Sequence, residues 1–208
     1  VAKDRDDIGT SGIVGSVLDK GWISGQVIAI SRLMEQGAQR PFKQVNSLRR
    51  LVDEISENRH LLTREIYIGR DGLPYDYETA RSRNPIIVDS DRAQATWLDT
   101  SGPNAWHQSI LLHEEFDRLS GTAPEKRSRG DLIADALFEQ LSRNLEDQVF
   151  KDILELRHKS IAHAADELSR STAKNLRNGI SLDEIAKAHY LLIGIYQVVS
   201  SNLLYQPW

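Results

Sequence analysis

The sequence Ser181-Leu182-Asp183-Glu184-Ile185 marks the start of a helix near the carboxyl end of the chain. A serine followed three residues later by a glutamate is typical of a capping box, in which each side chain accepts a hydrogen bond from the backbone N–H of the other residue. Gly179 interrupts the pattern before it. The predicted helix carries apolar side chains at helical spacing: Ile185, Leu192, Ile193, Tyr196, Val199 and Leu203.

Helical patterns recur on both sides of one irregular region. In one of them the apolar side chains of Leu48, Val52 and Ile55 lie on a single stripe, as in an amphipathic helix. Besides the carboxyl-terminal helix, helices are expected at about 11–35, 42–62, 105–120, 131–144 (with Asp131 as the cap) and from about 145 onward. The sequence therefore predicts an all-α fold, a bundle of about six helices in a single domain over residues 1–208.

The irregular region runs from about 63 to 104. Residues 64–68 alternate between polar and apolar side chains, and residues 86–88 are β-branched, both of which are typical of strands. Turn signals such as Asp71-Gly72 and Asn84-Pro85 separate these stretches. We expect a loop-rich insertion in the helical domain, with at most one small β-hairpin.

Composition excludes several classes of protein. The net charge of −4 rules out a generally basic nucleic-acid binder, so any contact with nucleic acid must come from a local patch. There is no cysteine, which excludes disulfides and thiolate chemistry and fits a reducing, cytoplasmic location. No run approaches the roughly 18 apolar residues of a membrane span. Because Val1 lies in a polar segment, we expect the chain to be trimmed there.

The segment Arg157-His158-Lys159-Ser160-Ile161-Ala162-His163 carries the strongest chemical signal. Arginine binds phosphate through its planar guanidinium group, which is permanently charged. Histidine exchanges protons near neutral pH. On a straight helix Arg157 and His163 would point about 120° apart and lie about 9 Å apart along the axis. The pair therefore requires a helix that bends or ends here, a sideways reach of the arginine, or a two-fold dimer that joins two copies.

Plainer explanations exist for the same residues. Between residues 155 and 177 basic side chains outnumber acidic ones by five to three, which is also typical of a solvated helix face. His163 could equally be a helix histidine that pairs with Asp166 or Glu167.

The segment from Leu156 to Asp166 resembles the signature of HEPN domains. That signature has an arginine, a polar residue directly after it, and a histidine after four to six intervening positions. Arg157 matches the arginine, His158 the polar position (often asparagine in the family), and His163 the histidine.

Three other stretches resemble the abortive-infection branch of the same family. They are Ile30-Ser31-Arg32-Leu33, the stretch from Leu48 to Ile55, and Phe116-Asp117-Arg118-Leu119-Ser120-Gly121. The resemblance extends over most of the chain, but only the Arg-His motif indicates a chemical activity.

The resemblance implies a helical bundle and a homodimer with the motif at its interface. It also implies metal-independent cleavage of RNA in a defence or toxin–antitoxin setting, with an antitoxin protein as a partner and with no cofactor or metal. Arg157 and His163 would be catalytic, and His158, Lys159 and Ser160 would contact the substrate. The alternative is a non-catalytic HEPN module that binds a partner protein or a nucleotide.

Other polar and aromatic groups are given structural roles. His113-Glu114-Glu115 lacks the second histidine of a zinc-binding helix, and we interpret His107 and His113 as surface residues. Tyr67, Tyr75 and Tyr77 could stack on bases, but anchoring a core or a loop is the more common role of such residues.

Overall fold

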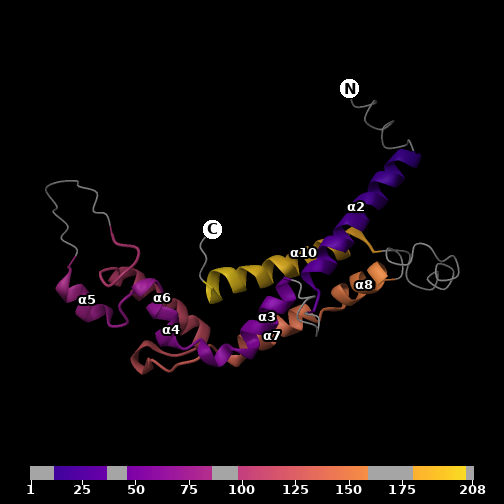
Figure 1. Ribbon diagram of the computed structural model, residues 1–208. Helices are drawn as coiled ribbons and strands as arrows, with labels where there is room; N and C mark the ends of the chain where they lie inside the picture. The colour runs from indigo at the N-terminus through magenta and orange to yellow at the C-terminus, as the bar shows by residue number, and fades with distance from the viewer. Residues whose placement is uncertain (1–11, 37–45, 86–97, 159–179, 205–208) are drawn as a thin grey trace. The chain divides into compact units, whose positions relative to one another are not determined.

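The computed structural model describes residues 12–36, 46–85, 98–158 and 180–204 (Figure 1). These residues are mostly helical, and no sheet forms among them, which confirms the all-α fold class. Strand pairing in the described residues is confined to an antiparallel bridge between Thr63 and Leu132. None of the helices in these ranges combines the length and the apolar composition that crossing a membrane requires.

The chain forms two compact units. Unit 1 consists of residues 1–53 and 141–208, and unit 2 of residues 54–140. The boundaries fall inside α3 (Leu48–Glu57) and α7 (Asp135–Leu145). Unit 2 contains the region predicted as an insertion at 63–104 and extends beyond it on both sides. A single domain over the whole chain stays a prediction.

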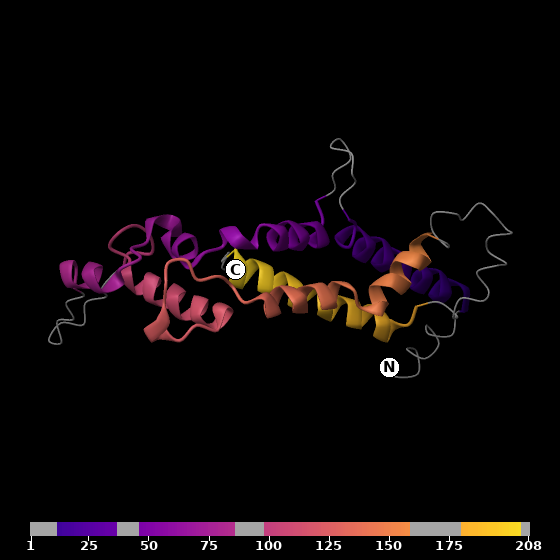
Figure 2. The same ribbon diagram turned by 90° about the horizontal axis from the view of Figure 1, so that it is seen from below.

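Three helices of unit 1 pack against one another: α2 (Gly12–Leu33), α8 (Gln148–Leu156) and α10 (Leu182–Gln197) (Figures 1 and 2). Complete burial contributes about 1.5–3 kcal/mol for each large apolar side chain. The buried apolar side chains described on these helices are Val27, Ile30, Val149, Phe150, Ile153, Ile185, Ala188, Leu192 and Ile195. Their helical spacing is the reason why these segments of the sequence form one core.

The ends of α8 and α10 are fixed by side chains. Ser181 accepts from the N–H of Glu184, whose carboxylate accepts from the N–H of Ser181, so the predicted capping box is confirmed. Asp147 caps α8 through the N–H of Val149 and also accepts from Lys187 of α10 at 2.8 Å. Beyond α10, residues 198–203 continue as a π-helix.

In unit 2, α4 (Arg64–Gly69) and α5 (Tyr77–Arg83) pack against α6 (Trp106–Ser120) (Figure 1). Short 3₁₀ turns lie before α4 at 59–61, between α4 and α5 at 70–72, and after α6 at 124–126. Gly121 ends α6 with a φ of 71°, a left-handed conformation that glycine adopts without strain, and its N–H bonds the carbonyl of Asp117 at 2.8 Å.

The strand expected at 64–68 is a helix. The hydroxyl of Thr63 accepts from the N–H of Ile66 and caps it. The N–H groups of Arg64 and Glu65 bond the carbonyls of Asp131 and Arg129, at 2.9 and 3.0 Å. These bonds satisfy donors that the first turn of a helix leaves open. The β-branched stretch at 86–88 lies outside the described residues.

The prediction that Asp131 caps a helix is wrong. α7 begins at Asp135, and the Asp131 carboxylate instead accepts from the side chain of Arg64 and from the N–H of Ser128. Asp131 thus joins the loop before α7 to α4.

Candidate functional site

Arg157 lies directly after α8 in unit 1. α8 ends at Leu156, and the backbone at Arg157 and His158 is π-helical. The position of His163 relative to Arg157 lies outside the described residues, so the arrangements that the sequence leaves open for this pair stay predictions.

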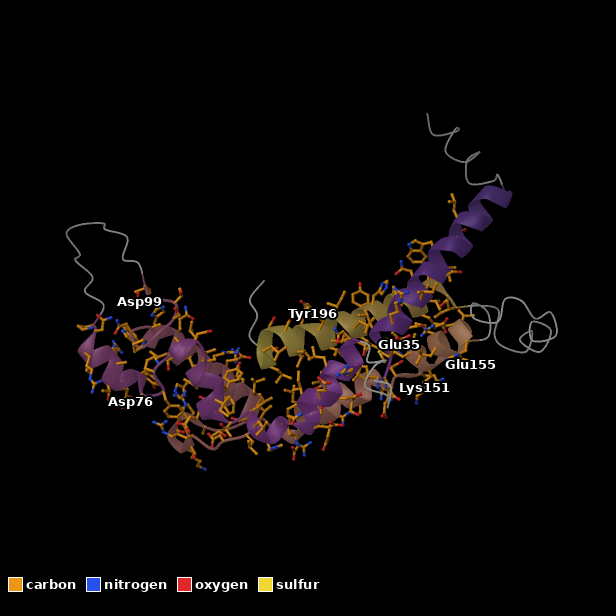
Figure 3. All side chains as sticks on the ribbon, in the orientation of Figure 1. Glu35, Asp76, Asp99, Lys151, Glu155 and Tyr196 are labelled. Carbon is orange, nitrogen blue, oxygen red and sulfur yellow. The ribbon has the colours of Figure 1, made fainter. Side chains whose placement is uncertain are left out.

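The side chain of Arg157 pairs with a carboxylate from another part of the chain. Its Nη1 lies 2.7 Å from Oε1 of Glu35, the second residue after α2. Glu35 is labelled in Figure 3, as are Lys151 and Glu155 of α8. The Arg157 side chain remains 32 % exposed. Because guanidinium has five N–H donors in a fork, a pair through one nitrogen orients the group and leaves it able to bind an anion.

Only part of the predicted motif is described. His158 is exposed. Lys159, Ser160 and His163 lie outside the described residues, so their roles stay predictions. Glu35 is not predictable as a partner of Arg157, since nothing in the sequence links positions 35 and 157 until α2 and α8 are packed together.

Unit 2 contains a network of buried charges centred on Arg64. Its side chain is 0 % exposed. Nε donates to Oδ2 of Asp131 at 2.8 Å, and Nη1 donates to Oδ1 of Asp117 at 2.8 Å. The guanidinium also lies 4.6 Å from the ring centre of Phe116. An arginine side chain can be buried when carboxylates and an aromatic face surround its charge in this way.

Asp117 accepts hydrogen bonds from two arginines. Besides Arg64, it accepts from Nε and Nη2 of Arg127, at 3.1 and 2.6 Å to Oδ2. Burial alone would raise the pKa of Asp117, but the hydrogen bonds and charges of Arg127 and Arg64 outweigh it and lower this pKa. The carboxylate therefore stays ionised, and it connects α4, α6 and the loop that holds Arg127.

A pocket of about 370 Å³ opens beside this network in unit 2. His113 of α6 lines it and is 2 % exposed, so the interpretation of His113 as a surface residue is wrong. Tyr75 and Tyr77 meet the His113 ring edge-on, with ring centres 5.0 and 5.4 Å away. The pocket is completed by Asp76 (labelled in Figure 3), Glu78, Pro124, Arg127 and Arg129.

The hydrogen bond of His113 determines its tautomer. Its Nε2 lies 3.0 Å from the carbonyl oxygen of Tyr75, and a carbonyl only accepts, so Nε2 carries the hydrogen. Nδ1 of the neutral ring is then an acceptor, and this buried atom has no hydrogen-bond partner among the described residues. Burial lowers the pKa of His113, and the charges of Arg127 and Arg64 add to this effect, against the hydrogen bond to Tyr75 and the charge of Asp117.

Unit 2 is expected to lose stability as the pH falls below about 6.5, the unperturbed pKa of histidine. Above that pH His113 is neutral in both states; below it, the unfolded chain binds a proton that the folded chain resists. Asp117 adds to the loss only at lower pH, because its stabilisation persists until the pH falls through its lowered pKa. The measurement is the protection of α6 amides from hydrogen exchange between pH 8 and 5, corrected for intrinsic rates. Replacing His113 by glutamine should abolish the change between pH 6.5 and 5, and an unchanged profile in that variant would contradict the assignment.

The described residues contain no group of three or more histidine, aspartate or glutamate side chains that could hold a metal ion. The expectation that no metal takes part stays a prediction. No family model, curated protein or solved structure matches this chain.

Proposed function

We propose that the chain is a metal-independent ribonuclease of the HEPN type that acts in a defence or toxin–antitoxin setting. The observation that supports this most is the position of Arg157. Its guanidinium lies at the end of α8, oriented by Glu35 and partly open to solvent, and His163 follows six residues later in the sequence. An oriented cation with a proton-exchanging group nearby in the chain is suited to phosphodiester cleavage.

The reaction is attack by the RNA 2′-oxygen on the adjacent phosphorus. The O2′–P bond forms as the P–O5′ bond breaks, giving a 2′,3′-cyclic phosphate and a free 5′-hydroxyl. One His163 takes the proton of the 2′-hydroxyl, and the His163 of a second copy gives a proton to the leaving 5′-oxygen. Arg157 stabilises the charge that develops on the phosphate oxygens, while His158, Lys159 and Ser160 contact neighbouring phosphates.

The test is incubation of the purified chain with end-labelled single-stranded RNA in EDTA. Cleavage with 2′,3′-cyclic phosphate ends is expected, and a substrate with 2′-deoxyribose throughout should remain intact. Absence of cleavage under these conditions, or cleavage of the deoxy substrate, would count against the proposal.

A homodimer is part of this proposal, and exposed apolar side chains on α10 support it. Leu182, Tyr190 and Ile193 are 63 %, 77 % and 53 % exposed. At 100° per residue these three positions fall within an arc of about 80° on the helix. Large exposed apolar side chains gathered on one helix face favour a protein–protein contact, and a second copy of the chain would place the same helix face on both sides of a two-fold axis.

Replacing Ile193 by aspartate is expected to convert the dimer to a monomer, because it places a charge in the apolar contact. The molar mass is measured by light scattering during size-exclusion chromatography. Leu111→Asp is the matched control, since Leu111 is 50 % exposed on α6 and lies outside this face. A parent chain that is monomeric at the concentrations used for cleavage would exclude the dimer.

The second candidate function is a non-catalytic helical module that binds a partner protein such as an antitoxin. The same face of α10 favours it, because an apolar face can receive a helix of another protein as well as a second copy. A chain that is monomeric and leaves RNA intact, but copurifies in a defined ratio with the product of a neighbouring gene through Ile193, would support this function instead.

A further inference from the structure

We infer that the pocket of unit 2 is a binding site for a small, uncharged heteroaromatic ring that carries an N–H donor, of the size of a nucleoside. The inference is independent of the proposed nuclease, because every residue that carries it lies within residues 54–140.

His113 brings a hydrogen-bond acceptor to the pocket that no described residue pairs with. His113 is almost fully buried, its Nε2–H is committed to the Tyr75 carbonyl, and its Nδ1 has no partner within the described ranges. A buried polar atom without a hydrogen bond destabilises the fold, so such atoms are rare and often belong to a functional site. The missing partner must be a donor, because neutral Nδ1 can only accept.

Aromatic side chains line the pocket. Tyr75 precedes α5 and Tyr77 is the first residue of α5, and both rings flank His113. The guanidinium of Arg129 lies 4.2 Å from the centre of the Tyr75 ring. Tyrosine rings and a guanidinium plane are the groups on which planar heteroaromatic ligands stack.

The pocket carries charges of both signs. Asp76 and Glu78 carry negative charges at the pocket, and Arg127 and Arg129 carry positive ones. Arg127 is committed to Asp117 and to the hydroxyl of Tyr77, and Arg129 forms an ion pair with Glu65. A site with this balance does not select a polyanion. A volume of about 370 Å³ lies at the small end of the range for ligand pockets and is sufficient for a nucleoside.

The experiment is a calorimetric titration of the full chain with adenosine, cytidine, guanosine and uridine, each of which carries N–H donors on the base. N6,N6-dimethyladenosine is the ligand control, because it keeps the ring of adenosine and lacks its N–H donor. At least one nucleoside should bind with a dissociation constant in the millimolar range or below. If adenosine is among the binders, its dimethyl derivative should bind at least about tenfold more weakly, or 1.4 kcal/mol. Equal binding of the two adenosines, or binding of none of the four nucleosides, would overturn the inference and leave water as the partner of Nδ1.

Two variants connect binding to the pocket. His113→Gln places an amide donor where Nε2 lies and removes the ring acceptor, and should weaken binding at least about tenfold. Arg129→Ala tests the same pocket from an exposed position that does not endanger folding, with Arg118→Ala as the control, because Arg118 is an exposed arginine of unit 2 paired with Glu115 outside the pocket. Loss of affinity in Arg129→Ala but not in Arg118→Ala supports the site, and equal affinity in both contradicts it.

A last pair of titrations distinguishes a free nucleoside from a base within a strand. A 2′-O-methyl oligonucleotide cannot be cleaved through its 2′-oxygen, so its binding is measured without turnover. Affinity for the oligonucleotide that depends on Arg129 identifies a base of an RNA strand as the ligand, whereas affinity for the nucleoside alone identifies a free metabolite. Either result is obtained whether or not the chain cleaves RNA, so failure of the nuclease proposal and failure of this inference are distinguishable.

Discussion

Replacing Arg64 by methionine is expected to lower the free energy of unfolding of unit 2 by about 3–5 kcal/mol, the cost of breaking a buried ion pair by removing one partner. Methionine fills a similar volume, so packing against Phe116 is largely kept. The loss arises because Asp131 loses its bond from Nε and Asp117 keeps only Arg127. Their carboxylates are only 15 % and 13 % exposed, so water does not replace the arginine fully.

The free energy is measured from the slowest-exchanging amides of α4 and α6. Arg118→Met is the control: Arg118 is 75 % exposed and pairs with Glu115 on the same helix, so its loss should change stability by no more than about 0.5 kcal/mol. A loss of less than about 1 kcal/mol in Arg64→Met would show that the network does not hold α4 to α6.

Replacing His163 by alanine is expected to reduce the rate of RNA cleavage by about 10²–10⁴-fold, the usual contribution of a general acid or base. Replacing Arg157 by alanine should reduce the rate by about 10²–10³-fold, as the loss of one group that stabilises developing negative charge does elsewhere. The single-turnover rate in EDTA is the quantity to compare, because it excludes effects on product release.

His60→Ala is the matched control for the histidine. His60 lies in the 3₁₀ turn at 59–61 of unit 2, is exposed, and has no role in the proposed reaction or in the α10 contact, so its replacement should leave the rate unchanged. Arg157 and Glu35 are partly exposed, so loss of their ion pair should cost about 1 kcal/mol of stability or less, and the Arg157 variant should remain folded. Equal rate losses in the His163 and His60 variants would contradict the assignment.

Local sequence signals predicted the helices well where the deciding residues are close together in the chain. The capping box at Ser181 depends on residues three positions apart and is present in the structure. Of the apolar positions predicted for the same helix, Ile185, Leu192, Val199 and Leu203 are buried, whereas Ile193 and Tyr196 are exposed. The alternating pattern at 64–68 wrongly suggested a strand. The helix that these residues form is stabilised by the carbonyl groups of Arg129 and Asp131, which lie more than sixty positions away in the chain.

The candidate sites were predicted less well, for the same physical reason. Arg157 stands out in the sequence, but Glu35 becomes its partner only when α2 packs against α8. His113 resembles a surface residue in the sequence because two glutamates follow it. In the structure, however, α6 places its side chain against Tyr75 and Tyr77. His113 is notable because its Nδ1 acceptor has no donor among the described residues. This property depends on the three-dimensional structure and cannot be read from the order of residues.

The division of the chain has a consequence for biosynthesis. Unit 1 is built from two segments, with the whole of residues 54–140 synthesised between them. On the ribosome α2 emerges long before α8 and α10, so its buried side chains Val27 and Ile30 must wait for their partners, whereas unit 2 can close as soon as its own residues are translated. Arrested nascent chains that end soon after residue 140 has left the exit tunnel should therefore already protect α6 from protease while α2 is still cut.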